Sequence, residues 1–271
     1  MPRIVSQHGT FADGVPYVRV GKGTRDLIVF FGGPGNMLPR GFGLRMMTKG
    51  FVPLMAAYRI TFVSRRPGLP EGVTTRDMSD HYAEMIRRDF AGHVNVVVGI
   101  SYGGMIAQHF AADHADLFDH IVIAMAAHRG SDAGMQVDMQ FARRLNQGKP
   151  RQAYAMLADV MAPEGIGRSL MRALLWLAGT WMPAARGEGN RRDVLIEAQA
   201  ELTHDATECL GRIDVPVLIL CGDADPYFPL ACIEETAEMM PDAKLKLYPG
   251  QGHDIMMDER FGRDILEFVT P

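Results

Sequence analysis

The stretch Val96–Phe110, with the sequence VVVGISYGGMIAQHF, sets a run of β-branched residues against a helical pattern and places a serine between them. Val96–Val98 predict a buried strand, and Met105–Phe110 predict a helix. The residues at the junction, GISYG, match the G-x-S-x-G turn, in which a serine hydroxyl stands exposed above a sheet. A serine hydroxyl becomes a useful nucleophile when it is exposed and a base takes its proton. We therefore predict Ser101 to be a nucleophile.

Short β-rich runs alternate with amphipathic stretches along most of the chain. This alternation is typical of an α/β fold, with a mostly parallel sheet covered by helices on both faces. We expect eight strands, the first two forming an antiparallel hairpin: Arg3–Gln7, Pro16–Val20, Asp26–Phe31, Tyr58–Ser64, Val94–Ile100, His120–Ala127, Pro216–Gly222 and Ala243–Gly250. The helices expected around them are Asp80–Phe90, Tyr102–His114, Leu230–Met239 and Asp258–Phe268.

One interval interrupts this alternation. Between Ile121–Ala127 and Pro216–Gly222 lie about ninety residues without a convincing strand, too many for a loop in a compact domain. They predict an inserted helical lid at 129–212, between core parts at 1–128 and 213–271. The helices expected there are Met135–Asn146, Arg151–Met161, Ser169–Trp181 and Arg192–Leu210.

A base and a carboxylate later in the chain would complete the order Ser…Asp…His. Asp223 and Asp225 come just beyond an apolar strand, and His253 comes just beyond the next one, after a glycine-rich loop. We take His253 as the base. With these motifs the chain resembles the serine-nucleophile, lid-bearing α/β-hydrolase superfamily, from Ile4 through the final helix. The resemblance implies an α/β-hydrolase fold.

The choice of acid follows from the resemblance. Similar hydrolases carry G-x-x-D-x-x-x-P after the strand, and Gly222, Asp225 and Pro229 match this pattern. We therefore favour Asp225 as the residue that orients His253. Asp223 is expected to stabilise the turn by accepting hydrogen bonds from backbone N–H groups.

The resemblance also implies an oxyanion hole, for which we assign the backbone N–H groups of Gly33 and Tyr102. Gly33 lies in the sequence FGGPG after a strand, and Phe31 stands where the family usually has a histidine that braces this loop. A phosphate-binding loop is disfavoured because the Walker pattern is absent. Arg65 and Arg66 depart from the family pattern, and we expect both to be solvated loop residues.

The chemistry that these features imply is hydrolysis of a carboxylic ester, or a related acyl bond, through an acyl-enzyme. A proline-iminopeptidase-like activity is an alternative, since FFGGPG is similar to the loop of those enzymes. It would need acidic residues to hold a substrate amine, and the candidates by region are Glu188, Glu197, Glu201 and Glu208. A carbon–carbon bond hydrolase and a ligand-binding protein without catalysis on the same fold are further alternatives.

We expect the pocket to be apolar and adaptable, with Phe31, Met105, Trp176 and Trp181 contacting substrate. The lid is rich in methionine and aromatic residues, which refit around different shapes. These residues are Met135, Met139, Phe141, Tyr154, Met156, Met161, Met171, Trp176, Trp181 and Met182. We predict a preference for a medium-sized apolar acyl or ring-bearing substrate over acetates and highly charged compounds.

Composition excludes several other classes. A net charge of −4 gives no electrostatic reason to expect nucleic acid as a partner. The three cysteines lack CxxC spacing and predict neither a disulfide framework nor a thiolate metal site, so we expect no metal or cofactor. The N-terminal residues lack a signal-peptide pattern, and the longest apolar stretch is too short to span a bilayer. We therefore expect a cytoplasmic protein that acts on a small molecule, and a homodimer is left open.

Overall fold

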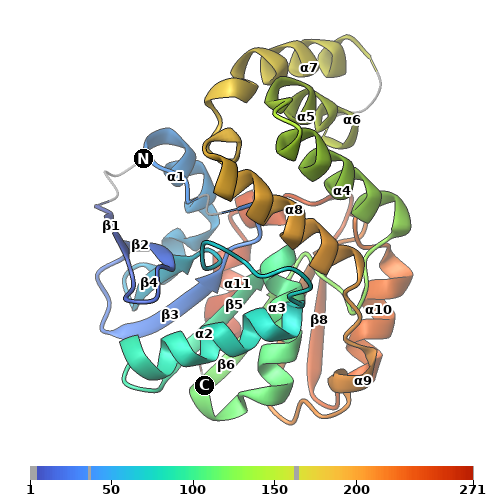
Figure 1. The fold of residues 1–271 in the computed structure, drawn as a ribbon. Coiled ribbons are helices and arrows are strands. Elements are labelled where there is room, and N and C mark those ends of the chain that lie inside the picture. Colours follow the sequence, from blue (N-terminus) through green and yellow to red (C-terminus); the bar gives the residue numbers. More distant parts are fainter. Residues whose placement is uncertain (1–4, 36–37, 162–164, 271) are drawn as a thin grey trace.

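The computed structural model describes residues 5–35, 38–161 and 165–270, and its centre is one eight-stranded sheet (Figure 1). The strand order is β1-β2-β4-β3-β5-β6-β7-β8. β1 and β2 pair antiparallel, β2 pairs antiparallel with β4, and all other pairs are parallel. The predicted eight-stranded, mostly parallel sheet is therefore confirmed. The strands are β1 (Gln7–Thr10), β2 (Pro16–Val20), β3 (Arg25–Phe30), β4 (Tyr58–Val63), β5 (Val94–Ile100), β6 (Phe118–Ala124), β7 (Val217–Gly222) and β8 (Ala243–Tyr248).

The first strand lies further along the chain than predicted. We expected it at Arg3–Gln7, but it begins where that range ends; Arg3 and Ile4 lie outside the described residues. The reason is the tight turn between Thr10 and Pro16, in which the N–H of Phe11 donates to the carbonyl of Val15 at 2.9 Å. Because this turn is short, the residues that directly flank it pair with each other, and the pairing runs from Thr10 and Pro16 to Gln7 and Arg19.

Both faces of the sheet are covered by helices, because strand side chains alternate between them. Ile28 and Phe30 of β3 pack under α2 and α3, whereas Leu27 and Val29 pack on the opposite face with η1 and α11. The helices of the core are α1 (Gly41–Met47), the 3₁₀ helices η1 (Lys49–Leu54), η2 (Ala115–Leu117) and η5 (Ile255–Met257), α2 (Thr75–Asp89), α3 (Tyr102–Asp113), α10 (Leu230–Met239) and α11 (Phe261–Phe268).

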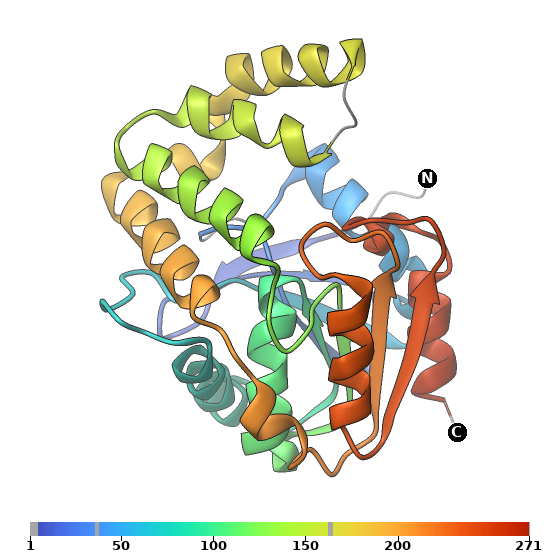
Figure 2. The same cartoon turned by 90° about the vertical axis from the view of Figure 1, so that its right-hand side faces the viewer.

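The segment between β6 and β7 is helical; residues 132–202 stand over one end of the sheet, whereas the short helix Thr207–Leu210 lies beside α10 (Figure 2). Met139, Phe141, Leu145 and Tyr154 belong to a separate apolar cluster in this insertion. Cys209 and Leu210, by contrast, pack into the cluster between sheet and helices. The elements of the segment between β6 and β7 are α4 (Asp132–Asn146), α5 (Pro150–Met156), α6 (Ala158–Met161), α7 (Ile166–Ala178), η3 (Gly179–Trp181), η4 (Pro183–Ala185), α8 (Glu188–Leu202) and α9 (Thr207–Leu210). Among the described residues, no helix combines the length and apolar character needed to cross a bilayer.

Candidate active site

Ser101 occupies a strained turn between β5 and α3. Its φ of 54° and ψ of −121° are rarely adopted by residues other than glycine, and such conformations cost on the order of 1–3 kcal/mol. The glycines on either side make the turn sterically accessible. A Cβ atom on Gly103 would collide with the carbonyl oxygen of Phe30, and one on Gly99 would collide with Ala107 and Gly103. The fold therefore holds the serine hydroxyl at the carboxyl end of the sheet.

His253 links Ser101 to Asp225 in a continuous line of hydrogen bonds. The Nε2 atom of His253 lies 2.8 Å from the Oγ atom of Ser101, and its Nδ1 atom lies 2.7 Å from the Oδ2 atom of Asp225. Because an ionised carboxylate accepts only, Nδ1 carries the ring proton and Nε2 accepts from the serine hydroxyl. The structure thus brings the three residues singled out from sequence into contact.

The environment of Asp225 holds this line in place. Asp225 is buried, and its Oδ1 atom accepts hydrogen bonds from the backbone N–H groups of Tyr227 at 2.9 Å and Phe228 at 3.2 Å. The rings of these two residues lie against the imidazole of His253. Asp223 instead accepts from the N–H of Gly250 at 2.6 Å, so it joins the loop after β7 to the loop after β8 rather than bonding within its own turn, as the sequence had predicted.

Backbone of the 31–35 loop lies beside Ser101. A Cβ atom on Gly32 would meet the carbonyl oxygen of Ile100 and the Cβ atom of Ser101, so only glycine permits this approach. Gly33 follows directly. Tyr102 is the first residue of α3, where a backbone N–H has no acceptor within the helix. Both segments expected to supply the oxyanion hole therefore border the serine.

Arg65 is not a solvated loop residue, and that expectation was wrong. It is 2% exposed, and its guanidinium group donates to the carbonyl oxygens of Phe31, Gly33 and, at 3.2 Å, Gly35. The carbonyls of the glycine loop point inward and need a buried donor, which Arg65 supplies from the end of β4. Arg65 thus braces the loop in which Phe31 replaces the usual histidine. Arg66 is exposed, as expected.

A carboxylate balances the buried charge of Arg65. Glu197 of α8 accepts from the Nε and Nη2 atoms of Arg65, both at 3.0 Å, and also from the N–H of Gly35 at 2.6 Å. Burial alone would lower the pKa of Arg65, but Glu197 raises it above its ordinary value. One ion pair therefore ties the helical insertion to the glycine loop.

Ser101 and His253 open into a cavity of about 1240 Å³ between the sheet and the insertion. Its walls are partly apolar and partly charged, and Arg65 is among the charged residues. The apolar side chains include Phe141, Tyr154, Leu157, Leu175, Met182 and Val194. The acidic ones include Asp138 of α4 and Glu201 of α8.

These two carboxyl groups differ from ordinary surface acids. Burial raises the pKa of Asp138 to about 6, against the opposing effects of His253 and of the Tyr227 hydroxyl. Burial and the neighbouring Asp138 raise the pKa of Glu201 well above its ordinary value. The Tyr227 hydroxyl donates to Asp138 at 3.4 Å. Sequence reasoning named Glu201 only by region and missed Asp138 and Tyr227, because no local motif marks them.

The four residues expected to contact substrate do not line this cavity. Met105 is fully buried between α3 and the sheet, and Phe31 packs against the core on the opposite face. Trp176 and Trp181 are 42% and 66% exposed. Trp176 lies over the guanidinium group of Arg151, at 4.6 Å, on the outer side of the insertion.

The expectation for the two tryptophans was wrong for a physical reason. The apolar residues of α7, which carries Trp176, and of η3, which carries Trp181, exceed one stripe, and the surplus faces solvent rather than the cavity; Ile166, Leu170 and Leu174 are exposed as well. Of the methionine and aromatic residues named from sequence, Phe141, Tyr154 and Met182 do line the cavity. The side chain of Met161 lies outside the described residues.

A cluster of possible metal ligands lies apart from these lining residues. Among the residues that the structure describes, His128, Cys232 and Glu235 form the one group of three or more whose ligand atoms lie within 4.8 Å of one another. None of the three lines the cavity that contains Ser101.

Known proteins share features with this chain. Residues 63–260 match the model of a family described as alpha/beta hydrolase fold. A 71-residue stretch is 41% identical to a non-heme chloroperoxidase of Kitasatospora aureofaciens, covering 24% of this chain and 26% of the relative. A 168-residue stretch is 27% identical to a pimeloyl-[acyl-carrier protein] methyl ester esterase of Chromobacterium violaceum, covering 58% and 62%. The chain thus spans less than two thirds of the length of either relative.

A solved structure extends the likeness of fold to nearly the whole chain. The structure of a hydrolase from Pseudomonas aeruginosa PA01 superposes with a TM-score of 0.72 and covers 98% of each chain at 18% identity. At that identity the likeness concerns the fold alone.

Proposed function

The chain belongs to the alpha/beta-hydrolase family, and on that premise we propose that it is a serine hydrolase that cleaves a carboxylic ester of a medium-sized apolar substrate. The observation that carries the proposal is the line Asp225–His253–Ser101 at the cavity, with hydrogen bonds of 2.7 and 2.8 Å. A relative named as a methyl ester esterase supports the class of bond.

The mechanism follows from the donors and acceptors at the serine. The Nε2 atom of His253 takes the hydroxyl proton as the Oγ atom of Ser101 attacks the ester carbonyl carbon. The N–H groups of Gly33 and Tyr102 stabilise the negative oxygen of the tetrahedral intermediate. The imidazolium then protonates the leaving alcohol, and the acyl group remains on Ser101. In the second half, His253 deprotonates a water molecule that attacks the acyl-enzyme and releases the acid.

The cavity supports an apolar acyl group in particular. Phe141, Leu157 and Leu175 offer it hydrophobic contacts, and burying such groups contributes about 25 cal/mol per Å² of apolar surface. A second carboxylate on the substrate would meet Asp138 and Glu201, which repel it whenever they are ionised. We therefore expect dicarboxylate esters to be poor substrates.

One observation favours a second candidate, hydrolysis of an amide or ester that carries a free amine. Asp138 and Glu201 face the cavity that contains Ser101, and a substrate ammonium group would compensate them. Of the four acids considered from sequence, Glu188 and Glu208 do not line the cavity, and Glu197 is paired with Arg65. Of these four acids, Glu201 is therefore the one that could hold the substrate amine in a proline-iminopeptidase-like reaction.

A substrate panel tests these proposals. p-Nitrophenyl esters of graded acyl length, lactones, thioesters, amino-acid arylamides and a dienolate ring-cleavage product are assayed with wild type and Ser101→Ala. We expect turnover of medium-chain esters that Ser101→Ala abolishes, and labelling of Ser101 by a serine-directed phosphonate. Faster release of arylamine would favour the second candidate, and loss of the dienolate chromophore a carbon–carbon hydrolase. Thermal stabilisation by these compounds without turnover of any would indicate a binding protein.

A further inference from the structure

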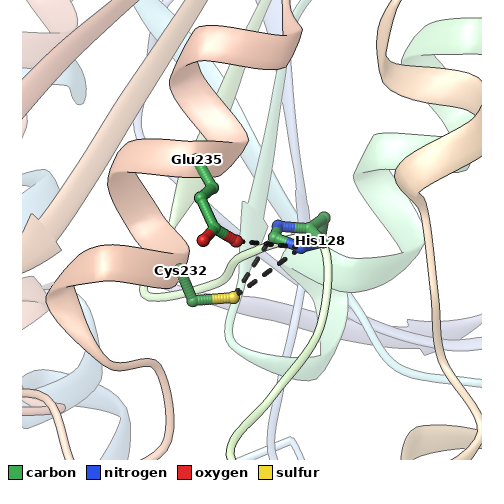
Figure 3. A group of neighbouring side chains, drawn as sticks. All are labelled: His128, Cys232 and Glu235. Carbon is green, nitrogen blue, oxygen red and sulfur yellow. Dashed lines mark hydrogen bonds and ion pairs between the residues drawn. The ribbon is translucent and has the colours of Figure 1, made fainter.

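His128, Cys232 and Glu235 lie at the junction between the core and the helical insertion (Figure 3). His128 comes four residues after β6 ends, where the chain leaves for the insertion, and its carbonyl oxygen accepts from the N–H of Ala206 on the returning chain at 2.9 Å. Cys232 and Glu235 stand three residues apart on α10 and therefore share one face of that helix. The cluster thus touches both crossings between core and insertion.

The hydrogen bonds around His128 assign its protons. Thr236 has one hydroxyl hydrogen, which it donates to the carbonyl oxygen of Cys232 at 2.6 Å. Its Oγ1 atom also lies 2.9 Å from the Nδ1 atom of His128, so at that contact the imidazole must donate. His128 is 1% exposed, and burial favours the neutral ring. Nδ1 therefore carries the proton, and Nε2 presents a lone pair.

Two further potential ligand atoms lie near this imidazole. The Nε2 atom of His128 lies 3.7 Å from the Oε2 atom of Glu235, and the Sγ atom of Cys232 lies 3.7 Å from Nδ1 and 4.0 Å from Nε2. Once the thiol has lost its proton, Cys232 and Glu235 would place two negative charges beside the imidazole, and a divalent cation would compensate both. A ligating histidine that donates its other N–H to an oxygen is also the usual arrangement around protein metals.

We propose that His128, Cys232 and Glu235 form a site for a zinc-like divalent cation, with a water molecule as the fourth ligand. Sulfur, imidazole nitrogen and carboxylate oxygen are the ligands that zinc takes in proteins, at separations of about 3.3–3.6 Å between ligand atoms in a tetrahedron. Binding requires the thiol, which now donates to the carbonyl oxygen of Arg129 at 3.2 Å, to lose its proton to solvent and turn toward Nε2. The cation would fasten the chain that leads from β6 into the insertion to α10.

Arg129 is the competing cation at this site. Its Nη2 atom lies 3.3 Å from the Oε2 atom of Glu235, and its side chain is 59% exposed, so it can swing into solvent when a metal binds. Removing the Arg129 charge should therefore tighten metal binding several-fold.

Cobalt provides the direct test, because Co²⁺ bonded to a thiolate gives an intense near-ultraviolet charge-transfer band. Chelator-treated protein is titrated with Co²⁺ and, separately, heated with and without Zn²⁺. We expect one Co²⁺ per chain with a thiolate band, and a higher midpoint of thermal unfolding with Zn²⁺. Cys232→Ser should lose the band, and Thr236→Val should weaken binding roughly 10- to 100-fold by freeing the imidazole orientation.

Matched controls make the outcome decisive. Cys209→Ser removes another thiol beside a histidine, His109 at 3.6 Å, and should keep the band. Ser101→Ala should bind Co²⁺ as wild type does, so this result does not depend on the proposed hydrolysis. Glu235→Gln changes an exposed side chain and should weaken binding while the protein stays folded. Absence of the band in wild type, or its persistence in Cys232→Ser, would overturn the proposal.

Discussion

The core and the helical insertion contribute to the same cavity in different ways. The core places side chains from turns at strand ends: Ser101 after β5, Asp225 after β7 and His253 after β8. The insertion presents side chains from the middle of helices, such as Asp138 of α4 and Leu175 of α7. At a strand end the local backbone dictates where a side chain points. For a helix, the elements against which the helix packs determine which of its faces meets the cavity.

The largest effect should follow from removing the nucleophile that the core presents. Ser101→Ala should remain folded, because alanine lacks only the hydroxyl, and should lose turnover by roughly 10⁴-fold or more. The measurement is kcat with the best ester of the panel, with circular dichroism to verify folding. Unchanged turnover would show that the core turn does not supply the nucleophile.

The two aspartates of the core provide a matched pair. Asp225→Asn should reduce kcat by about 10⁴-fold, because the amide no longer stabilises the correct tautomer and charge of His253. Asp223→Asn keeps an oxygen that accepts from Gly250 and should reduce kcat far less. The reverse ranking would mean that the wrong carboxylate was assigned.

The Arg65–Glu197 ion pair between core and insertion should affect stability and turnover separately. Arg65→Met leaves Glu197 buried without its partner and should lower the free energy of unfolding by about 3–5 kcal/mol. Arg65→Met combined with Glu197→Gln should recover most of that stability, as followed by urea denaturation. Turnover of the double variant should stay low with KM little changed, since the carbonyls of the glycine loop have lost their donor. Recovery of kcat together with stability would reduce Arg65 to a purely structural role.

Two adjacent residues of α7 test which face of the insertion meets substrate. Leu175 lines the cavity, whereas Trp176 lies in an outer groove with Arg172 and Leu177. Leu175→Ala should shift acyl-length preference by up to about tenfold in kcat/KM, the effect of one or two methylene groups in a pocket. Trp176→Ala should leave the preference unchanged. A larger shift from Trp176→Ala would contradict this orientation of the insertion.

The smallest effect concerns the pH dependence of stability. The pKa of Asp138 is about 6 in the folded protein, compared with about 3.9 unfolded, so between these values the folded state binds the extra proton. The contribution of Asp138 to the free energy of unfolding is therefore complete below pH 4 and decreases as the pH rises toward 6. Asp138→Asn removes that loss, so at pH values above 6 the variant should unfold at a temperature about 2–4 °C higher than wild type.

The outcome below pH 4 is the control for this last experiment. There the carboxyl is protonated in both states, and wild type and Asp138→Asn should unfold at similar temperatures. A variant that is less stable than wild type at pH 8 would show that the ionised carboxylate stabilises the insertion instead.

Local patterns in the sequence were enough to predict the sheet and to single out Ser101, Asp225 and His253, which the structure joins by hydrogen bonds. β-branched runs predicted strands because apolar periodicity acts over a few residues, and the G-x-S-x-G turn needs only its own glycines and flanking elements. The first strand was misplaced because its pairing depends on the turn from Phe11 to Val15 rather than on its own composition.

By itself, the sequence determined the order of strands and helices, the strained turn at Ser101, and the positions of Asp225 and His253 at strand ends. Only the tertiary structure decided that Arg65 braces the glycine loop through Glu197, 132 residues away, and that Trp176 faces solvent. The same holds for the contact between His128 and Cys232, 104 residues apart. Periodicity and turn chemistry operate between neighbours in the chain. Packing decides which partner a buried charge or a buried imidazole meets, because it joins segments that no local pattern relates.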